Sequence, residues 1–313
     1  VPNFRKAIEK YLVPAITRSQ HIKTFTFTRA DWESIEKEGK DAYIFVCHEP
    51  REALPQQIQE YIKWGETDCR TKIRGTRGGG KVCSEAEACR ARTGNPQIFR
   101  GWYDLGGYLP TPLMAIYHPR YHPQFFLCLV PVVTYANMIT LIPRIKIETD
   151  FMKYDPENYQ GILPKIVTKI KLDTKAIKAL MSYLNSTFTW IWLEQTSTAA
   201  AKGPLSLEAS QIANIPVLDI TKLSNEDIDE LAKLFDELEA EARQLVTKYE
   251  EMKEKTKQLA EGEEAEEGMK LKMFKELKPR FQEIDRKVAE VLGITVDVEW
   301  LWSSAWEMME RRI

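Results

Sequence analysis

The sequence predicts an α+β fold in which a mixed or antiparallel sheet is followed by a long helical hairpin. Between residues 102 and 149, short β-rich runs are bounded by Pro, Gly and Asn, and the spacers are too short to hold a helix between successive strands. From residue 224 onward, apolar residues instead recur every three or four positions. We therefore expect an α+β domain over residues 1–220 and a helical, coiled-coil-like arm over residues 221–313.

The first part of the chain is expected to alternate short helices and strands. Apolar spacing predicts a helix over residues 4–16, and strand-like runs follow at 21–27 and 42–46. A further helix is expected from Leu54 to Trp64, closed by Gly65.

The central part is expected to supply most of the sheet. Four apolar, β-rich runs follow Trp102 to Leu105, at residues 113–117, 125–133, 138–143 and 145–149. Helix starts are marked by capping residues, Thr28 before these runs and Asp173 after them. A second apolar stretch at 188–193 is expected to place Trp190 and Trp192 in the core.

The arm is expected to begin at Ser224, which opens a capping pattern. Its first helix continues to about residue 259, a charged hinge occupies 261–268, and a second helix stops at Gly293. The acid-rich outside of this hairpin is interpreted as a solvated face, and the arm is also a candidate docking surface for a partner subunit or neighbouring domain.

The composition is that of a folded chain without a membrane span. Of the 313 residues 43% are hydrophobic, and 44 Lys and Arg against 46 Asp and Glu leave a net charge of only −2. Total charge therefore neither favours nor excludes a polyanionic partner. The apolar run 125–133 is far shorter than the roughly 20 residues that cross a bilayer. Five cysteines, an odd number, and an opening at Val1 without a secretory signal indicate a cut piece of a longer cytoplasmic protein.

A basic, irregular loop over residues 66–101 is the strongest local signal. It loses all hydrophobic periodicity, and residues 70–81 hold five cations, four glycines and no acid. Clustered cations and close backbone approach suit phosphate, and the aromatic pair Trp102 and Tyr103 that follows suits nucleic acid. The alternative is a flexible solvated loop. Residues 75–81 also match seven positions of a phosphate-binding P-loop, but Val82 replaces the magnesium-binding Ser or Thr and no buried strand precedes it, which argues against nucleotide hydrolysis.

Cysteines and histidines offer a weaker signal for zinc. The possible ligands are Cys69, Cys83 and Cys89 with His48, His118 and His122. Their spacing is irregular and no Cys-x2-Cys pair occurs, so a Cys83–Cys89 disulfide or free thiols is the preferred interpretation. No catalytic triad is recognisable, and Asp104 is interpreted as an isolated carboxylate.

Motifs in the second half of the chain occur in a recognisable order. The first motif is a helix end, Leu184-Asn185-Ser186. It is followed by a small-residue loop from Thr196 to Gly203 and then by a strand end, Ile215-Pro216-Val217. Residues 102–105, 112–126 and 137–143 add strand-like segments, and residues 284–293 add a last helix. Together these segments, from about residue 95 onward, resemble the target-recognition domains of adenine-specific DNA methyltransferases.

The resemblance implies DNA recognition without catalysis in this chain. Catalytic domains of the family carry an Asn/Asp-Pro-Pro-aromatic tetrapeptide and a Gly-rich turn for S-adenosylmethionine. The nearest segment here, Asn95-Pro96-Gln97-Ile98, lacks the second proline and the aromatic ring. The resemblance therefore implies the specificity portion of an adenine-N6 methyltransferase of restriction-modification type, which binds double-stranded DNA. S-adenosylmethionine would bind in a separate catalytic domain or subunit, and no cofactor is expected in this chain.

Two kinds of DNA contact are expected from such a domain. Loop cations would bind phosphates, while Arg100, Arg120, Arg144 and the loop from Thr196 to Lys202 would read base edges. That small-residue loop has a rival interpretation as a tight connection. The candidate DNA contacts are Arg70, Lys72, Arg74, Arg77, Lys81, Arg90, Arg92, Arg100, Trp102, Tyr103, Arg120, Arg144, Thr196, Ser197 and Lys202.

Two other functions stay open from the sequence. The chain could be a stand-alone specificity subunit whose long helices dock separate methyltransferase and nuclease subunits, although a second recognition domain would then be expected. It could also be an autonomous zinc or cysteine enzyme with its site at Cys69, Cys83, His118 and His122.

Overall fold

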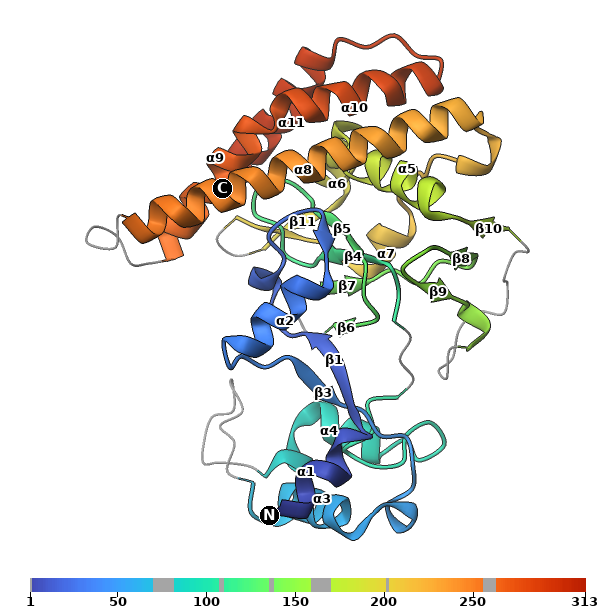
Figure 1. The fold of residues 1–313 in the computed structure, drawn as a ribbon, viewed down its shortest axis with the longest axis vertical. Helices are drawn as coiled ribbons and strands as arrows, with labels where there is room; N and C mark the ends of the chain where they lie inside the picture. The colour runs from blue at the N-terminus through green and yellow to red at the C-terminus, as the bar shows by residue number, and fades with distance from the viewer. Residues whose placement is uncertain are drawn as a thin grey trace.

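The fold is that of a computed structural model, which describes residues 2–69, 82–106, 110–134, 138–158, 170–200, 203–255 and 263–313. Figure 1 shows a layer of long helices at one end, short strands in the middle and a small helical lobe at the other end. The architecture is α+β with mixed and antiparallel sheets, as the sequence predicts.

The small lobe is built by the N-terminal part of the chain. It contains α1 (Pro2–Glu9), β1 (Leu12–Ile16), β3 (Tyr43–Phe45), α3 (Gln56–Thr67) and α4 (Glu87–Thr93). Its core includes Tyr11, Ile58, Ile62 and Tyr103. The helix predicted over residues 4–16 is wrong in its second half, because Pro14 cannot take part in a helix interior and the chain continues as β1.

Strands from distant parts of the chain form the middle layer. One sheet has the order β2-β5-β4-β7, from β2 (Thr26–Phe27), β5 (Phe125–Cys128), β4 (Leu113–Ile116) and β7 (Met138–Thr140). In it β4 pairs antiparallel with β5 and β7, and β2 pairs parallel with β5. In a second sheet β1 lies between β3, which is antiparallel, and β6 (Val133–Thr134), which is parallel. The second sheet therefore joins the small lobe to the middle layer.

Two further sheets complete the strands of the described residues. β8 (Lys146–Glu148) lies between β9 (Lys153–Tyr154) and β10 (Lys171–Leu172). β11 (Thr198–Ala199) and β12 (Leu205–Ser206) form an antiparallel pair, followed by the short helix α7 (Ala209–Ala213).

The helical layer comprises α5 (Thr174–Leu184), α6 (Thr187–Thr196), α8 (Asn225–Lys255), α9 (Glu263–Glu276), α10 (Lys278–Val291) and α11 (Val298–Arg312). The main hydrophobic core joins β4 and β5 to α5, α6, α8, α10 and α11. It includes Phe125, Trp190, Phe235, Phe281 and Trp302, all at most 4% exposed. This core extends across residue 220, and the division of the chain into two domains there stays a prediction.

The predicted hairpin differs from the observed helices in three ways. A further helix, α11, follows Gly293, where the second predicted helix stops. Residues 263–268, assigned to a charged hinge, belong to α9, and the single second helix is split into α9 and α10. Pro279, at the start of α10, has no N–H to continue the hydrogen-bond ladder of α9.

Capping residues begin three helices at the places that the sequence predicts. The hydroxyl of Thr28 accepts the N–H of Asp31 at the start of α2 (Arg29–Lys37), and the carboxylate of Asp173 accepts the N–H of Ala176 at 2.8 Å. The hydroxyl of Ser224 accepts the N–H of Asp227 at 3.1 Å. Each cap satisfies a helix N–H that has no partner within the helix.

A buried polar cluster fastens α8 to the strands. The Glu239 carboxylate is 8% exposed and accepts hydrogen bonds from the Thr24 and Thr26 hydroxyls and from the Phe25 N–H. Arg243, one turn further along α8, donates to Glu239 and makes two hydrogen bonds to the Asp31 carboxylate. The long helix is thereby locked to β2 and α2.

None of the helices in the described ranges is long and apolar enough to cross a membrane.

Candidate nucleic-acid interface

A groove on the small lobe collects several of the predicted DNA contacts. Its volume is about 470 Å³. We call it the aromatic groove, and its lining residues are Thr17, Arg18, Asp41, Tyr43, Ile44, Phe45, Tyr61, Arg92, Trp102, Tyr103 and Leu105. The fold thus brings Arg92, Trp102 and Tyr103 together with β3 and α3.

Three aromatic residues that line the groove, Tyr43, Phe45 and Tyr61, contact one another or further rings beside it. The ring of Tyr61 stacks on Trp64 at 5.9 Å and meets the ring of Phe45 at 5.5 Å. Tyr43 packs edge-on against Trp32 at 5.3 Å. Tyr43 and Trp64 are 39% and 45% exposed, so their rings keep faces in contact with water. Such faces can stack on a base or pack against a sugar.

Trp102 and Tyr103 form the wall of the groove. Tyr103 is 5% exposed and its hydroxyl donates to the backbone oxygen of Glu49, so its ring is not available for stacking on a ligand. The Trp102 ring lies so close to Gly65 that a Cβ added there would clash with it. Gly65 therefore lies within α3 and permits this packing, and the prediction that it closes the helix is wrong.

Two arginines, Arg18 and Arg92, line the groove. Arg18 and Arg100 are exposed, and so is Arg90 on α4. Arg92 is half-buried and donates from Nη1 to the backbone oxygen of Trp102 at 3.3 Å. Asp41 is the one carboxylate among the described lining residues, so this rim of the groove is more positive than negative.

A buried carboxylate, expected from the sequence to be isolated, fixes the loop beside the groove. Asp104 is fully buried, and its oxygens accept the N–H groups of Arg100 and Gly106, each at 2.8 Å. His48, which follows β3, lies with Nδ1 2.7 Å from the same carboxylate. Asp104 is therefore a positioning residue for the segment that carries Arg100 and Trp102. No spacing in the sequence indicates this pair, since 56 residues separate its members.

A disulfide joins Cys69 to Cys83, with the two Cα atoms 5.7 Å apart. The preferred Cys83–Cys89 pairing is therefore wrong, and Cys89 is a free, half-buried thiol. The bridge joins Cys69, which follows α3, to Cys83, which follows the basic segment in the sequence. The predicted phosphate contacts within that segment, Arg70, Lys72, Arg74, Arg77 and Lys81, lie outside the described residues.

Removing this bridge is expected to destabilise the small lobe. In the chain-entropy model a disulfide that closes a loop of about 15 residues stabilises a protein by about 3 kcal/mol. We expect the Cys69→Ser/Cys83→Ser variant to lose about that amount in denaturant unfolding, and Cys89→Ser, which removes a free thiol, to lose less. An unchanged unfolding midpoint of the wild-type chain after reduction would contradict the bridge.

Among the described residues, the predicted contacts Arg90, Arg100, Arg120, Thr196 and Ser197 do not line the groove. Thr196 and Ser197 end α6, and the exposed hydroxyl of Thr196 donates to the Trp192 backbone oxygen. The backbone oxygen of Arg120 accepts a hydrogen bond from Arg312 of α11. Lys202 lies outside the described residues.

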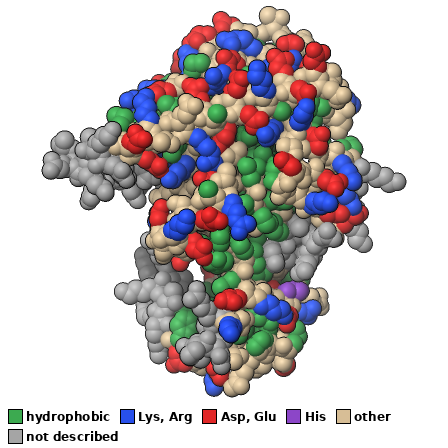
Figure 2. Space-filling view, in the orientation of Figure 1, with side chains coloured by type: hydrophobic (Ala, Val, Ile, Leu, Met, Phe, Trp, Pro, Cys, Tyr) green, Lys and Arg blue, Asp and Glu red, His purple; other side chains and the backbone are tan. Residues whose placement is uncertain are grey.

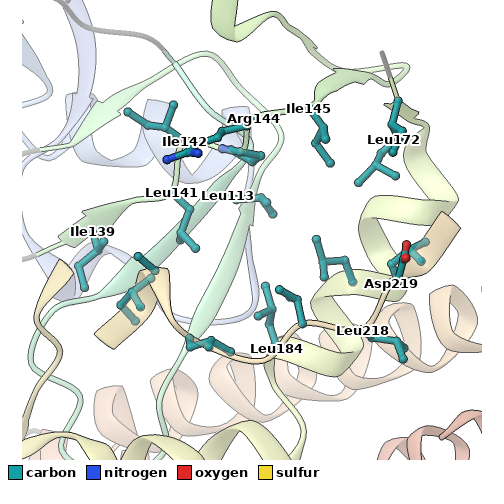
Figure 3. Close-up of a pocket in the computed structure, with 18 of the residues that line it drawn as sticks. Leu113, Ile139, Leu141, Ile142, Arg144, Ile145, Leu172, Leu184, Leu218 and Asp219 are labelled. Carbon is teal, nitrogen blue, oxygen red and sulfur yellow. The ribbon is translucent and has the colours of Figure 1, made fainter. Parts of the chain in front are cut away.

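Arg144 lies at a different hollow, which is mostly apolar. This pocket has a volume of about 490 Å³ and is bounded by β7, the segment before β8, α5 and α7. Figure 3 shows side chains of Leu113, Leu141 and Leu184 around it, with Arg144 and Asp219 on different sides. A pocket with so few polar groups does not suit a phosphate backbone.

The Leu-Asn-Ser motif has a structural role in the described fold. The side-chain amide of Asn185 is fully buried and accepts the N–H of Phe125, while its NH₂ donates to the Phe125 backbone oxygen. The end of α5 is thereby bonded to strand β5. Trp190 is buried and Trp192 packs against the same core, as the sequence predicts.

The residues of the alternative zinc or cysteine site are not assembled. Cys69 and Cys83 are bonded to each other, and the buried ring of His122 packs 4.6 Å from Phe281 and 5.0 Å from Trp190. Burial lowers the pKa of His122 to about 3. His118 is exposed and contacts the Leu205 backbone oxygen through Nδ1. Among the described residues no group of three or more His, Cys, Asp and Glu could hold a metal ion.

Surface charge on the face seen in Figure 2 is mixed. Acidic and basic side chains alternate over the helical layer, and hydrophobic side chains gather along the middle of the molecule. Affinity for a polyanion on this face would therefore depend on local groups of cations rather than on one positive surface.

The N-terminal part of the chain, which includes much of the small lobe, is similar to a known family. Residues 5–73 match the family model described as Type II methyltransferase M.Eco57I, C-terminal domain. These residues include β1, β3 and α3, which supply much of the aromatic groove. The match shows that this segment is similar to the C-terminal domain of a type II methyltransferase. It lies on the N-terminal side of the segments that carry the resemblance to target-recognition domains. No curated protein and no solved structure matches the chain.

Proposed function

We propose that this chain is the double-stranded DNA recognition part of an adenine-N6 DNA methyltransferase of a restriction-modification system. In this proposal it grips a specific site and positions the target adenine for methyl transfer from S-adenosylmethionine. The cofactor and the catalytic groups belong to a methyltransferase domain or subunit outside this chain, and the enzyme is cytoplasmic.

The observation that carries the proposal is the aromatic groove, built largely from the segment that matches a type II methyltransferase family. The exposed ring of Tyr43 and the cations Arg18 and Arg92 line the groove, and the exposed ring of Trp64 stacks on Tyr61 beside it. Rings and cations are the two contact types that nucleic-acid surfaces use. A methyltransferase extrudes its target base, so rings that face the opened site have bases and sugars to pack against. The basic segment adjoining Cys69 adds phosphate contacts in this proposal.

The primary test is binding of the purified chain to a random duplex library at several salt concentrations, followed by sequencing of the retained DNA. The proposal predicts one recovered motif and a steep decrease of affinity with salt. Binding without any motif would contradict site-specific recognition by this chain.

A double variant addresses the groove directly. We expect Tyr43→Ala/Arg92→Ala to bind the recovered duplex about 100-fold more weakly, because it removes one stacking face and one cation. The matched control is Arg286→Ala/Trp300→Ala, which removes an exposed arginine and an exposed tryptophan from the helical layer. Fluorescence anisotropy measures both, and equal affinities of the two variants would contradict a role for the groove.

A further inference from the structure

A second hollow lies where the end of α8 and helix α9 meet the turn after β1. Its volume is about 300 Å³, and we call it the arm pocket. Four cations line it, Arg18, Lys23, Lys40 and Lys270, together with one carboxylate, Glu250. Val246, Tyr249, Met269 and Met273 add apolar side chains from α8 and α9.

Two lysines of the arm pocket are held by ion pairs that a stronger anion can replace. Lys23 lies 2.5 Å from Glu250 and Lys40 lies 2.5 Å from Glu38, and all four side chains are about half exposed. Exposed pairs of this kind contribute little to stability, because water screens their attraction. A phosphate group could therefore take over either lysine at little cost.

His21 also lines the arm pocket, and two of the pocket's cations act on it. Burial is the main cause that lowers the pKa of His21, and the charges of Lys40 and Arg18 lower it further. Glu38 and Asp41 oppose that effect without reversing it.

The arm pocket adjoins the aromatic groove. Arg18 lines both hollows, and Lys40 of the arm pocket is followed directly in the chain by Asp41 of the groove. A duplex held at the groove would therefore have the arm pocket beside its backbone. A chain of phosphates is the ligand that spans two adjoining positive sites, since DNA carries one charge about every 1.7 Å of helix axis.

We propose that the arm pocket binds a backbone phosphate of the DNA held at the aromatic groove, so that the helical arm takes part in gripping the duplex. This inference rests on the proposed function. Its ligand chemistry is a phosphate ester, and DNA is the source that the continuity of the two hollows favours.

The test compares two double-lysine variants on the recovered duplex. Lys23→Ala/Lys40→Ala should lower affinity on the order of tenfold and reduce the slope of log affinity against log salt by about 2, one for each lysine withdrawn from the phosphates. The recovered sequence motif should not change, since phosphates carry no base information. Lys175→Ala/Lys222→Ala is the control, because it removes two exposed, ion-paired lysines on other parts of the fold. Circular dichroism establishes that both variants fold.

The outcomes separate this inference from the proposed function. If Lys23→Ala/Lys40→Ala keeps the wild-type slope while Tyr43→Ala/Arg92→Ala binds more weakly, the arm pocket assignment is overturned and groove recognition stands. If the groove variant also binds like wild type, both are overturned.

Inorganic phosphate is tested separately by NMR titration. Saturable binding that Lys23→Ala/Lys40→Ala abolishes without any change in DNA affinity would assign the pocket to a free phosphate and overturn the DNA assignment.

Discussion

Replacing Glu239 by alanine is expected to lower the free energy of unfolding by about 3 kcal/mol, because buried donors lose their acceptor and each unsatisfied buried group costs about 1–3 kcal/mol. The carboxylate accepts hydrogen bonds from Thr24, Phe25, Thr26 and Arg243, and it is 8% exposed. Without it, the Phe25 N–H is deprived of its acceptor and Arg243 is left with Asp31 as its ionic partner. Urea unfolding followed by circular dichroism measures the change.

Glu250→Ala is the matched control for this prediction. It is the same substitution on the same helix, but Glu250 is exposed and its ion pair is with the exposed Lys23. Its expected effect is below about 1 kcal/mol. Equal stabilities of the two variants would mean that the cluster around Glu239 does not fasten α8 to the strands.

The cluster around Glu239 also changes the pKa of Asp31, which contacts Arg243. Burial by itself would raise the pKa of the Asp31 carboxyl, but hydrogen bonds from Arg243 and Thr28 lower it overall. A carboxylate with a lowered pKa stabilises the fold above its ordinary pKa, and that stabilisation is lost as the pH falls through the lowered value. The joint between α8 and α2 therefore weakens in acid.

The contrast between helix caps and this cluster explains which parts of the fold are predictable from the sequence. Thr28, Asp173 and Ser224 act on N–H groups three residues away, so their role is visible in a short window. Glu239 meets Thr24 across 215 residues of chain. A contact of that separation leaves no local pattern.

The candidate site is predictable only in part for the same reason. Arg92, Trp102 and Tyr103 follow a basic segment that identifies them, and the fold places them at one groove. Tyr43 and Tyr61 look like ordinary strand and helix residues, and only the pairing of β1 with β3 and the packing of α3 bring them there.

The disulfide is another case in which the fold decides what spacing cannot. Cys69 pairs with Cys83, although Cys89 is nearer to Cys83 in the chain. The end of α3 and the segment after residue 81 bring the Cα atoms of the bonded pair within 5.7 Å, which is the ordinary separation for a disulfide.

A second large effect is expected from Asp285 on α10, as a dependence of stability on pH. The carboxyl is fully buried, and one oxygen accepts the N–H of Thr187 at 2.8 Å while the other has no hydrogen-bond partner among the described residues. Burial raises the pKa of Asp285 to about 7, although hydrogen bonds from Thr187 oppose the increase. The ordinary value of 3.8 applies when the chain is unfolded.

The sign of the effect follows from these two values. Below about pH 4 the Asp285 carboxyl is protonated in both the folded and the unfolded chain, so its ionisation does not destabilise the fold there. As the pH rises to 7, the unfolded chain loses this proton and the folded chain keeps it, so stability falls. A pKa difference of about 3 corresponds to about 4 kcal/mol at 1.36 kcal/mol for each pKa unit.

Asp285→Asn should remove this decline, because an amide cannot ionise and its oxygen can still accept the Thr187 N–H. We expect the variant to match the wild type near pH 4 and to be more stable by a few kcal/mol near pH 8, as measured by thermal unfolding over that range. Asp229→Asn is the control, since Asp229 is exposed on α8 and pairs with Lys175, and little change is expected from it. If the stabilities of the wild type and of Asp285→Asn change in parallel from pH 4 to pH 8, the buried carboxyl does not control the pH response. The packing of α10 against the start of α6 would then have to tolerate a buried negative charge.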